Sequence, residues 1–403
     1  MGIRVVAGHK PLKGLSGALL IDSIGLPRYC ATIWSEVIMA GLAPNTRIRH
    51  LYAVDRLYRA AELLGGNDLD RMLMTADFDA IEEILFAFHT KVRNEASAKG
   101  VSGNLVWTSA SRFVTDMLTY LGPSAEAQVK DLNNRMRRIQ RLYGQISPSP
   151  SRPPLPIRAL PSLVVSELCE IFDPKHARNP FRSERERWRN YLIFILLLHT
   201  GLRRSELAML PVDAISSSFD AQANNERHWI NVGRSPYANE DPRRDKPSLK
   251  TRYSARQLPV SEELAVISDL VGAYKKRRAI HPFLFGSQKG KPLNLRSFQR
   301  IMEIATGSLS VNAVKALQDR GTHSVTLHSL RHTCAVYRLS KYVDHGDNLD
   351  TACEKLRAFF GWSPSSPMPR HYGRAYFEAA AAEDWQESYD SLVNSLRRFD
   401  GVN

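Results

Sequence analysis

Two separate arginine motifs are the parts of this 403-residue chain best suited to chemistry. Arg203 lies in the segment TGLRRSEL, and Arg331 lies with His328 in the segment LHSLRHT. Transfer of a phosphoryl group needs a nucleophile, neutralisation of the phosphate charge and a proton for the leaving oxygen. Two guanidinium groups can hold the two non-bridging oxygens of a phosphate without a metal ion. The two motifs therefore predict a site for phosphoryl transfer.

The spacing in the first motif predicts how Arg203 is held. Gly201 marks the point where one helix ends and another begins, and this places Arg203 at a helix start. Glu206 follows three residues later, so it lies on the same helical face and is expected to hold Arg203 in position. An ordinary ion pair at the end of a surface helix would show the same pattern.

The second motif opens another predicted helix. His328 and Arg331 are three residues apart, so an imidazole and a guanidinium can face one phosphate. His332 directly follows Arg331, and one residue along a helix turns it away from that face. A lone histidine beside apolar residues usually has a structural role, but the pair matched with a second arginine motif favours a shared site.

The charge balance indicates a polyanionic partner. The chain has 55 Lys and Arg residues against 41 Asp and Glu, a net charge of +14 and a pI near 9.7. Arginine dominates the basic clusters, and its planar fork suits phosphate. We therefore expect nucleic acid as the partner, although a basic protein need not bind nucleic acid specifically.

The first half of the chain predicts an all-α module. One helix begins near Asn45, which can cap it, and ends at Gly65 and Gly66. Amphipathic segments follow over residues 78–92, 106–121 and 125–143. Basic side chains on the first and last of these helices could line DNA, although a solvated helix face explains each of them equally well. These candidates are Arg47, Arg49, Arg135, Arg138 and Arg141.

A Pro-rich stretch divides the chain. Residues 147–161 contain the segment SPSPSRPPLP, which favours an extended connector. We expect an all-α module over residues 43–146 and a second domain over residues 162–403, with residues 1–42 an unassigned N-terminal extension. The predicted fold is mainly α with a small antiparallel sheet in the second domain.

The elements of the second domain follow from local patterns. Ser162 is expected to cap a helix, and another helix is expected over residues 184–199. Short β-like runs lie between residues 228 and 260 and suggest a hairpin. From residue 293 onward the pattern is helical again.

Several classes of protein are disfavoured. The longest apolar run, residues 191–198, is too short to span a bilayer, and no signal segment opens the chain. Cys30, Cys169, Cys334 and Cys353 show no metal-binding spacing. No P-loop is present. We expect no metal, no nucleotide cofactor and no other cofactor, and a soluble, cytoplasmic protein associated with the nucleoid of a prokaryotic cell.

These motifs resemble the tyrosine recombinases, also called phage-type integrases. The family pattern has an arginine in a TGLRxSEL turn, a lysine in a β-hairpin, an HxxR helix start, a His or Trp after a Gly, and a tyrosine. The segment LKTRYSARQLPV resembles the hairpin element and identifies Lys250. LRAFFGW places Trp362 at the His/Trp position, and RHYGR supplies Tyr372. The resemblance covers most of the chain after about Leu42.

The resemblance implies a two-lobed DNA clamp and a separate role for each residue of the active site. Tyr372 would attack the scissile phosphate and form a 3′-phosphotyrosyl link. Arg203 and Arg331 would stabilise the phosphorane, and Lys250 would protonate the departing 5′ oxygen. His328 would assist proton transfer, while Trp362 would brace the site.

Some positions depart from the family pattern. Tyr372 follows Trp362 by ten residues, one more than is common, with prolines between them. Tyr372 is therefore expected on a loop or at a helix start, and Tyr376 is the competing nucleophile. Lys246 competes with Lys250. An insertion is expected around residues 216–226.

The implied function is that of a site-specific recombinase, acting as a homotetramer on paired sites in double-stranded DNA and encoded by a mobile element. The alternatives are a type IB topoisomerase-like enzyme, which would relax DNA as a monomer, and a catalytically silent DNA-binding protein. The segment after Tyr372 reads as one long amphipathic helix. In this family such a helix often docks on a neighbouring subunit.

Overall fold

The computed structural model of the chain describes residues 19–64, 68–99, 103–122, 159–221, 224–243, 246–276 and 281–373, with residues 134, 137, 138 and 141. It divides into two compact units, Met1–Leu155 and Pro156–Asn403, and the division lies inside the Pro-rich stretch. None of the described helices is both long and apolar enough to cross a membrane. Each unit is described by itself below.

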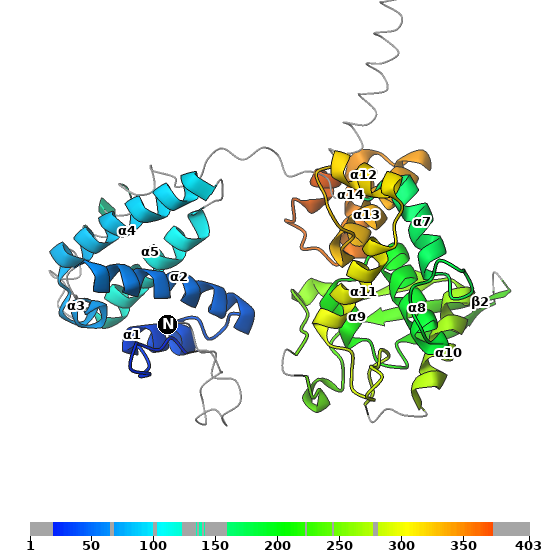
Figure 1. Cartoon of the computed structure of the whole chain (residues 1–403), viewed down its shortest axis with the longest axis horizontal. Helices are drawn as coiled ribbons and strands as arrows, with labels where there is room; N and C mark the ends of the chain where they lie inside the picture. The colour runs from blue at the N-terminus through cyan, green and yellow to red at the C-terminus, as the bar shows by residue number, and fades with distance from the viewer. Residues whose placement is uncertain are drawn as a thin grey trace, which may run out of the picture. The chain divides into compact units, whose positions relative to one another are not determined.

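The first unit is helical in its described part from Tyr29 onward, and before that it has an isolated β-bridge between Ile21 and Pro27 (Figure 1). Helix α2 begins at Pro44 and not at a cap on Asn45, because proline at the first helical position loses only an N–H that would have no partner there. The elements are α1 (Tyr29–Ile33), the π-helix η1 (Trp34–Ile38), α2 (Pro44–Leu63), α3 (Leu69–Thr75), α4 (Phe78–Lys99) and α5 (Asn104–Leu121).

Residues before Leu42 form part of the core of this unit. Cys30 and Trp34 are fully buried, and the Trp34 Nε1–H donates to Asp116 at 2.8 Å. The carboxylate of Asp70, on α3, accepts from the backbone N–H groups of Tyr29 and Cys30, each at 3.1 Å, and so caps α1. The extension that sequence left unassigned therefore belongs to the first unit from about Leu20 onward.

The second unit is built around one buried helix, α8 (Glu184–Thr200). Its apolar run, residues 192–197, is buried on every side, as expected for a helix that passes through the middle of a domain. The other helices are α7 (Ser162–Phe172), α9 (Arg204–Met209), α10 (Glu262–Lys276), α11 (Leu295–Gly307), α12 (Val311–Asp319), α13 (Leu327–Asp344) and α14 (Leu349–Phe360) (Figure 1). Ser162 is the first residue of α7, and its cap position is Pro161.

A small antiparallel sheet completes this unit. Its strands are β1 (Ile215–Asp220), β2 (Asn225–Val232) and β3 (Arg256–Val260), in the order β1-β2-β3. Ile230 pairs with Leu258, and both side chains are buried. The predicted fold class is confirmed. The stretch expected to be an insertion, residues 216–226, overlaps strand β1 and the start of β2.

Two left-handed glycines bring distant segments together. Gly201 (φ +58°) ends α8, and a Cβ there would lie 2.4 Å from the ring of Phe360. Gly361 (φ +60°) ends α14, and a Cβ there would lie 2.7 Å from the carbonyl oxygen of Tyr253. Because only glycine fits both the backbone angle and the space, the ends of α8 and α14 can pack closely.

Candidate active site

Arg203 lies at the N-cap of α9, immediately after the turn at Gly201. Its backbone N–H donates to Glu206 Oε2 at 2.9 Å, and its Nη1 donates to Glu206 Oε1 and, at 3.1 Å, to Ser254 Oγ. The contact expected from the spacing of three is therefore present. The carboxylate satisfies a helix-start donor and orients the guanidinium at the same time.

Glu206 is a buried carboxylate shared by two arginines. Its side chain is completely buried, and it also accepts from Arg256 Nη2 at 3.0 Å. Burial alone would raise the pKa of Glu206, but Arg256, Arg203 and Arg331 outweigh it and lower the pKa. Glu206 therefore stays ionised and holds the cations in place.

Arg256 was not predicted as part of the site. It lies on β3, donates from Nε to the carbonyl oxygen of Phe359 at 2.8 Å, and donates from Nη1 to that of Ser254 at 2.7 Å. With its bond to Glu206, this guanidinium joins the sheet, α9 and the end of α14. It is a positioning residue, and two of its three partners, Glu206 and Phe359, are distant in sequence.

Arg331 lies in the first turns of α13, a helix that begins with a capping box. The Oγ1 of Thr326 accepts from the N–H of Ser329 at 3.0 Å, and the Oγ of Ser329 accepts from the N–H of Thr326 at 2.8 Å. The guanidinium of Arg331 is buried and donates to the carbonyl oxygens of Gly201 and, at 3.0 Å, of Phe360. Burial and the nearby Arg203 lower the pKa of Arg331 to about 9.

The two histidines of this helix form a pair. The Nε2 atoms of His328 and His332 are 2.9 Å apart, so one ring donates to the other. His328 is exposed, whereas His332 is buried with its ring centroid 5.1 Å from that of Tyr372. The prediction that His332 points away from the site is wrong. His332 lies four residues after His328, and that spacing brings it to the same face.

Tyr372 lies in a short helical stretch, residues 368–373, after the non-helical segment 362–367. Its ring is fully buried and stacks on Trp362, with centroids 5.6 Å apart and planes 14° apart. Burial raises the pKa of Tyr372 to about 12, although Arg331 opposes this shift. Tyr376 lies outside the described residues, as does the predicted C-terminal helix.

Lys250 lies in the connection between β2 and β3, just before the short 3-10 turn η3 (Arg252–Ser254). The side chains of Lys250 and Lys246 are both exposed. Only Lys250 lines the same cavity as Arg203 and Arg331. Geometry therefore favours Lys250 over Lys246.

The six predicted catalytic residues line one cavity of about 770 Å³ in the second unit. They come from the α8–α9 turn, the β2–β3 connection, α13, the end of α14 and the helical stretch after it. Arg204, Thr251, Gln299 and Ser363 also line it. The six are Arg203, Lys250, His328, Arg331, Trp362 and Tyr372. Groups that could bind a phosphate, attack it and protonate the departing oxygen are thus brought together.

The arginines suggested as DNA contacts in the first unit differ among themselves. Arg47 is a correction: it is buried, donates to the carbonyl oxygen of Ser35 and pairs with Glu36 at 3.3 Å, so its charge serves the fold. Arg49, Arg138 and Arg141 are exposed, and Arg138 donates to Glu82. Arg135 lies outside the described residues.

No group of three or more His, Cys, Asp or Glu side chains in the described part of the chain is placed to hold a metal ion. All four cysteines are free. The titratable side chains that line the cavity carry guanidinium, ammonium, imidazole and phenol groups.

Comparisons with known proteins give a family match. Residues 168–377, more than half of the chain, match the phage integrase family. Among curated proteins no sequence matches.

Similar solved structures include the Tn1549 transposon integrase in complex with circular intermediate DNA, with 17% identity, 87% of this chain and 99% of that chain covered, and a TM-score of 0.46. The XerH site-specific recombinase bound to difH is 16% identical, with 87% of this chain and 82% of that chain covered and a TM-score of 0.47. A lambda integrase dimer bound to a core site is 13% identical, with 85% of this chain and 75% of that chain covered and a TM-score of 0.44. The family match spans both arginine motifs, Lys250 and Tyr372, and it confirms the resemblance drawn from them: the chain belongs to the phage integrase family.

Proposed function

We propose that the chain is a site-specific tyrosine recombinase that cleaves and rejoins DNA through a 3′-phosphotyrosyl intermediate. The observation that carries this proposal is the single cavity that holds Arg203, Arg331 and Tyr372 with the other three predicted residues. Segments separated by more than a hundred residues contribute to it. A phosphoryl-transfer site needs this set of groups in one place.

The two arginines keep donors available for a phosphate. A guanidinium has five N–H donors, and the contacts described above use two of them in Arg203 and two in Arg331. Three therefore remain on each. These donors would bind the non-bridging oxygens and stabilise the charge that develops on the phosphorane.

Cleavage would then proceed by exchange of one ester for another. The phenolic oxygen of Tyr372 forms a bond to phosphorus, the bond from phosphorus to the 5′ oxygen breaks, and Lys250 donates a proton to that oxygen. The proton of Tyr372 must leave as it attacks, because the phenol is protonated at neutral pH and burial raises its pKa further, to about 12. His332, whose ring centroid lies 5.1 Å from that of Tyr372, and its partner His328 are suited to assist. Rejoining reverses these steps and needs no external energy source.

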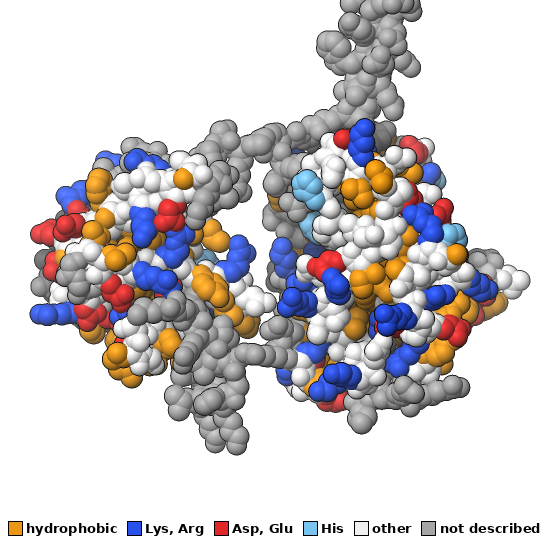
Figure 2. Space-filling model, viewed as in Figure 1, with side chains coloured by type: hydrophobic (Ala, Val, Ile, Leu, Met, Phe, Trp, Pro, Cys, Tyr) orange, Lys and Arg blue, Asp and Glu red, His pale blue; other side chains and the backbone are white. Residues whose placement is uncertain are grey.

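The proposed partner is double-stranded DNA, bound at paired sites by a homotetramer that a mobile element encodes. The net charge of +14 supports such a polyanion, and Lys and Arg side chains are spread over the visible face of each unit (Figure 2). Binding should weaken steeply as salt rises, because phosphate contacts release counterions. The protein would act in the cytoplasm, at the nucleoid of a prokaryotic cell.

Capture of a covalent adduct tests this function. Direct repeats in the DNA flanking the gene would supply the substrate, and a nicked duplex carrying that site should trap the full chain on its 3′ phosphate. Tyr372→Phe should abolish the adduct, whereas Tyr337→Phe, which removes the hydroxyl of an exposed tyrosine outside the cavity, should leave it unchanged.

Three outcomes would contradict the proposal. An adduct of unchanged yield in Tyr372→Phe would show that another residue attacks. Relaxation of a plasmid without the site by monomeric protein would indicate a topoisomerase-like enzyme. Tight binding to the site with no adduct on any nicked substrate would indicate a silent DNA-binding protein.

A further inference from the structure

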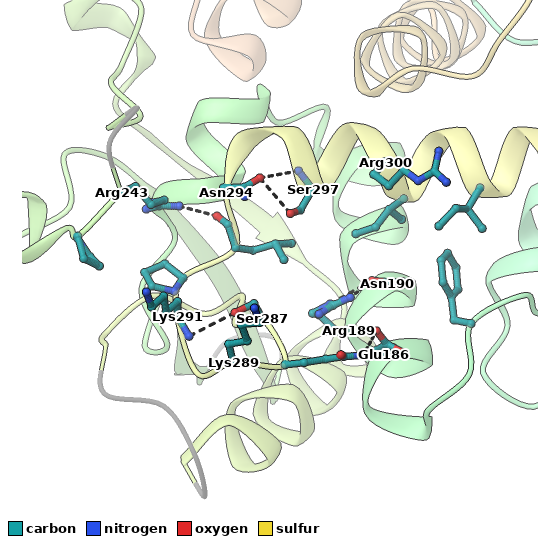
Figure 3. Close-up of a pocket in the computed structure, with 17 residues that line it drawn as sticks. Glu186, Arg189, Asn190, Arg243, Ser287, Lys289, Lys291, Asn294, Ser297 and Arg300 are labelled. Carbon is teal, nitrogen blue, oxygen red and sulfur yellow. Dashed lines mark hydrogen bonds between the residues drawn. The ribbon is translucent and has the colours of Figure 1, made fainter. Parts of the chain in front are cut away.

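A second cavity of the second unit has no part in the proposed reaction. It encloses about 680 Å³ and shares no lining residue with the site described above. Figure 3 shows it between the start of α8, the loop that carries Ser287 and Lys291, and helix α11 with Ser297 and Arg300. Its lining combines basic groups with an apolar wall.

Arg189 is a buried cation at this cavity. Its side chain donates from Nε and Nη2 to Asn190 Oδ1 at 3.1 and 2.9 Å, and from Nη1 to the carbonyl oxygen of Gly286 at 3.0 Å. No carboxylate of the described residues lies within ion-pair distance of it. Three of its five donors are used, so two remain without an acceptor. A buried charge in this state is costly, and the more distant Glu186 compensates it only in part, because burial still lowers the pKa of Arg189.

Asn190 adds unpaired donors beside it. The residue is 1% exposed and lines the cavity, and its Oδ1 is occupied by Arg189. Within the described part of the chain, its Nδ2 has no hydrogen-bond partner. Buried polar groups in proteins are nearly always satisfied, so this amide indicates an acceptor that the protein itself does not provide.

The rim of the cavity is basic. Lys289 and Lys291 are exposed there, and neither forms an ion pair with a described residue. Arg243 is neutralised by Asp241 at 2.9 Å. Glu186 is the one carboxylate among the lining residues, and it already accepts from Gln288 Nε2 at 2.8 Å. Positive charge therefore exceeds negative charge around the cavity.

One part of the cavity wall is apolar. Phe181, Leu293 and Ile301 are almost fully buried and line the cavity together with Ile304. An inorganic ion would leave this wall and most of the volume unused. A ligand with a small hydrocarbon or ring body attached to its anionic group would cover both regions.

We propose that this cavity binds a small organic phosphate monoester, with its phosphate on Arg189 and Asn190 and its body on the wall formed by Phe181 and Ile301. A phosphate of duplex DNA presents the same chemistry. Arg189, however, is only 8% exposed at the base of a concave site, which favours a small molecule over the broad surface of a duplex.

Phenyl phosphate is a suitable probe, measured by isothermal titration calorimetry on the full chain. Asn190→Asp is the decisive variant because it keeps the shape of the side chain and supplies Arg189 with a carboxylate. It should weaken phenyl phosphate binding by roughly tenfold or more, and it should raise the melting temperature of the unliganded protein. Benzyl alcohol, which lacks the charge, should not bind measurably.

A second variant tests the rim without touching the buried groups. Lys289→Ala with Lys291→Ala should weaken binding by roughly three- to tenfold, whereas Lys315→Ala, on α12 and outside the cavity, should not change it. The proposal is overturned by any of three results. These are no saturable binding of phenyl phosphate up to about 10 mM, unchanged affinity in Asn190→Asp, and weakened binding of a short DNA duplex in these variants without any binding of the ester.

Discussion

Replacing Glu206 by Gln tests whether one buried carboxylate organises the candidate active site. The substitution keeps the size of the side chain and removes its charge. Arg203 and Arg256 would each lose a charged partner while staying largely buried, with side-chain exposures of 19% and 6%. Removal of one partner from a buried ion pair costs about 3–5 kcal/mol. We expect the free energy of unfolding to fall by about 3 kcal/mol, the lower end of this range, because the glutamine oxygen can still accept one hydrogen bond.

A matched control is present on α11. Arg300 and Glu303 have the same order and the same spacing of three as Arg203 and Glu206, but their side chains are 69% and 46% exposed. Glu303→Gln should therefore change stability by less than about 0.5 kcal/mol. The comparison separates burial from the simple presence of an ion pair.

The stability lost in Glu206→Gln should depend on pH with a definite sign. Because the folded protein holds the pKa of Glu206 below its usual value of 4.5, its contribution is fully present above that pH. This contribution is lost progressively as the pH falls from about 4.5 to below the lowered pKa of Glu206 in the folded state. The stability difference between the wild type and Glu206→Gln should therefore shrink on acidification.

Urea unfolding of the second unit at pH 7 and at progressively lower pH measures this difference. The accompanying activity assay is the rate of adduct formation on a nicked site, which should fall by roughly a hundredfold in Glu206→Gln, because the guanidinium of Arg203 loses its orientation. A stability difference that stays constant with pH, or one no larger than that of Glu303→Gln, would refute the role given to Glu206.

Three further predictions concern neighbouring residues. Gly201→Ala should destabilise the second unit by about 2 kcal/mol or more in urea unfolding, because the added methyl meets Phe360 and the backbone is left-handed; wild-type stability would contradict the packing described. His332→Gln should slow adduct formation by roughly tenfold and change its pH profile, since His328 loses its ring partner; a slower rate with an unchanged profile would indicate a purely structural role. Lys250→Ala should slow cleavage strongly, and a substrate with sulfur in place of the 5′ oxygen should restore the rate, because a thiolate leaves without a proton; equal slowing on both substrates would rule Lys250 out as the acid.

Local spacing predicts those parts of the site that depend on one helix turn. Arg203 with Glu206, and His328 with Arg331, could be read from the sequence because a glycine or a capping residue sets where each helix starts. His332 shows the limit of this reasoning. The step of one residue from Arg331 predicts that His332 points away from the site, whereas its spacing of four from His328 decides its direction.

Contacts between distant segments could not be predicted in this way. Arg256 is recognisable only once β3, α9 and the end of α14 are seen together. Arg189 and Asn190 precede an apolar run that reads as an ordinary buried helix, and nothing local indicates that a loop nearly a hundred residues later closes a cavity over them. The helices near residues 29–38 and 69–75 were missed because short segments carry little periodicity.

The charge arrangement around Glu206 suits phosphoryl transfer. Arg203, Arg256 and Arg331 lie close enough to influence this one carboxylate, so three positive charges face one negative charge. Burial is the main cause of the lowered pKa of Arg331, and repulsion from Arg203 and Arg256 adds to it although Glu206 opposes the shift. A phosphodiester would bring one negative charge and the phosphorane would bring about two. The cluster is therefore best neutralised by the phosphorane, and that is the condition for lowering the barrier and not merely for binding DNA.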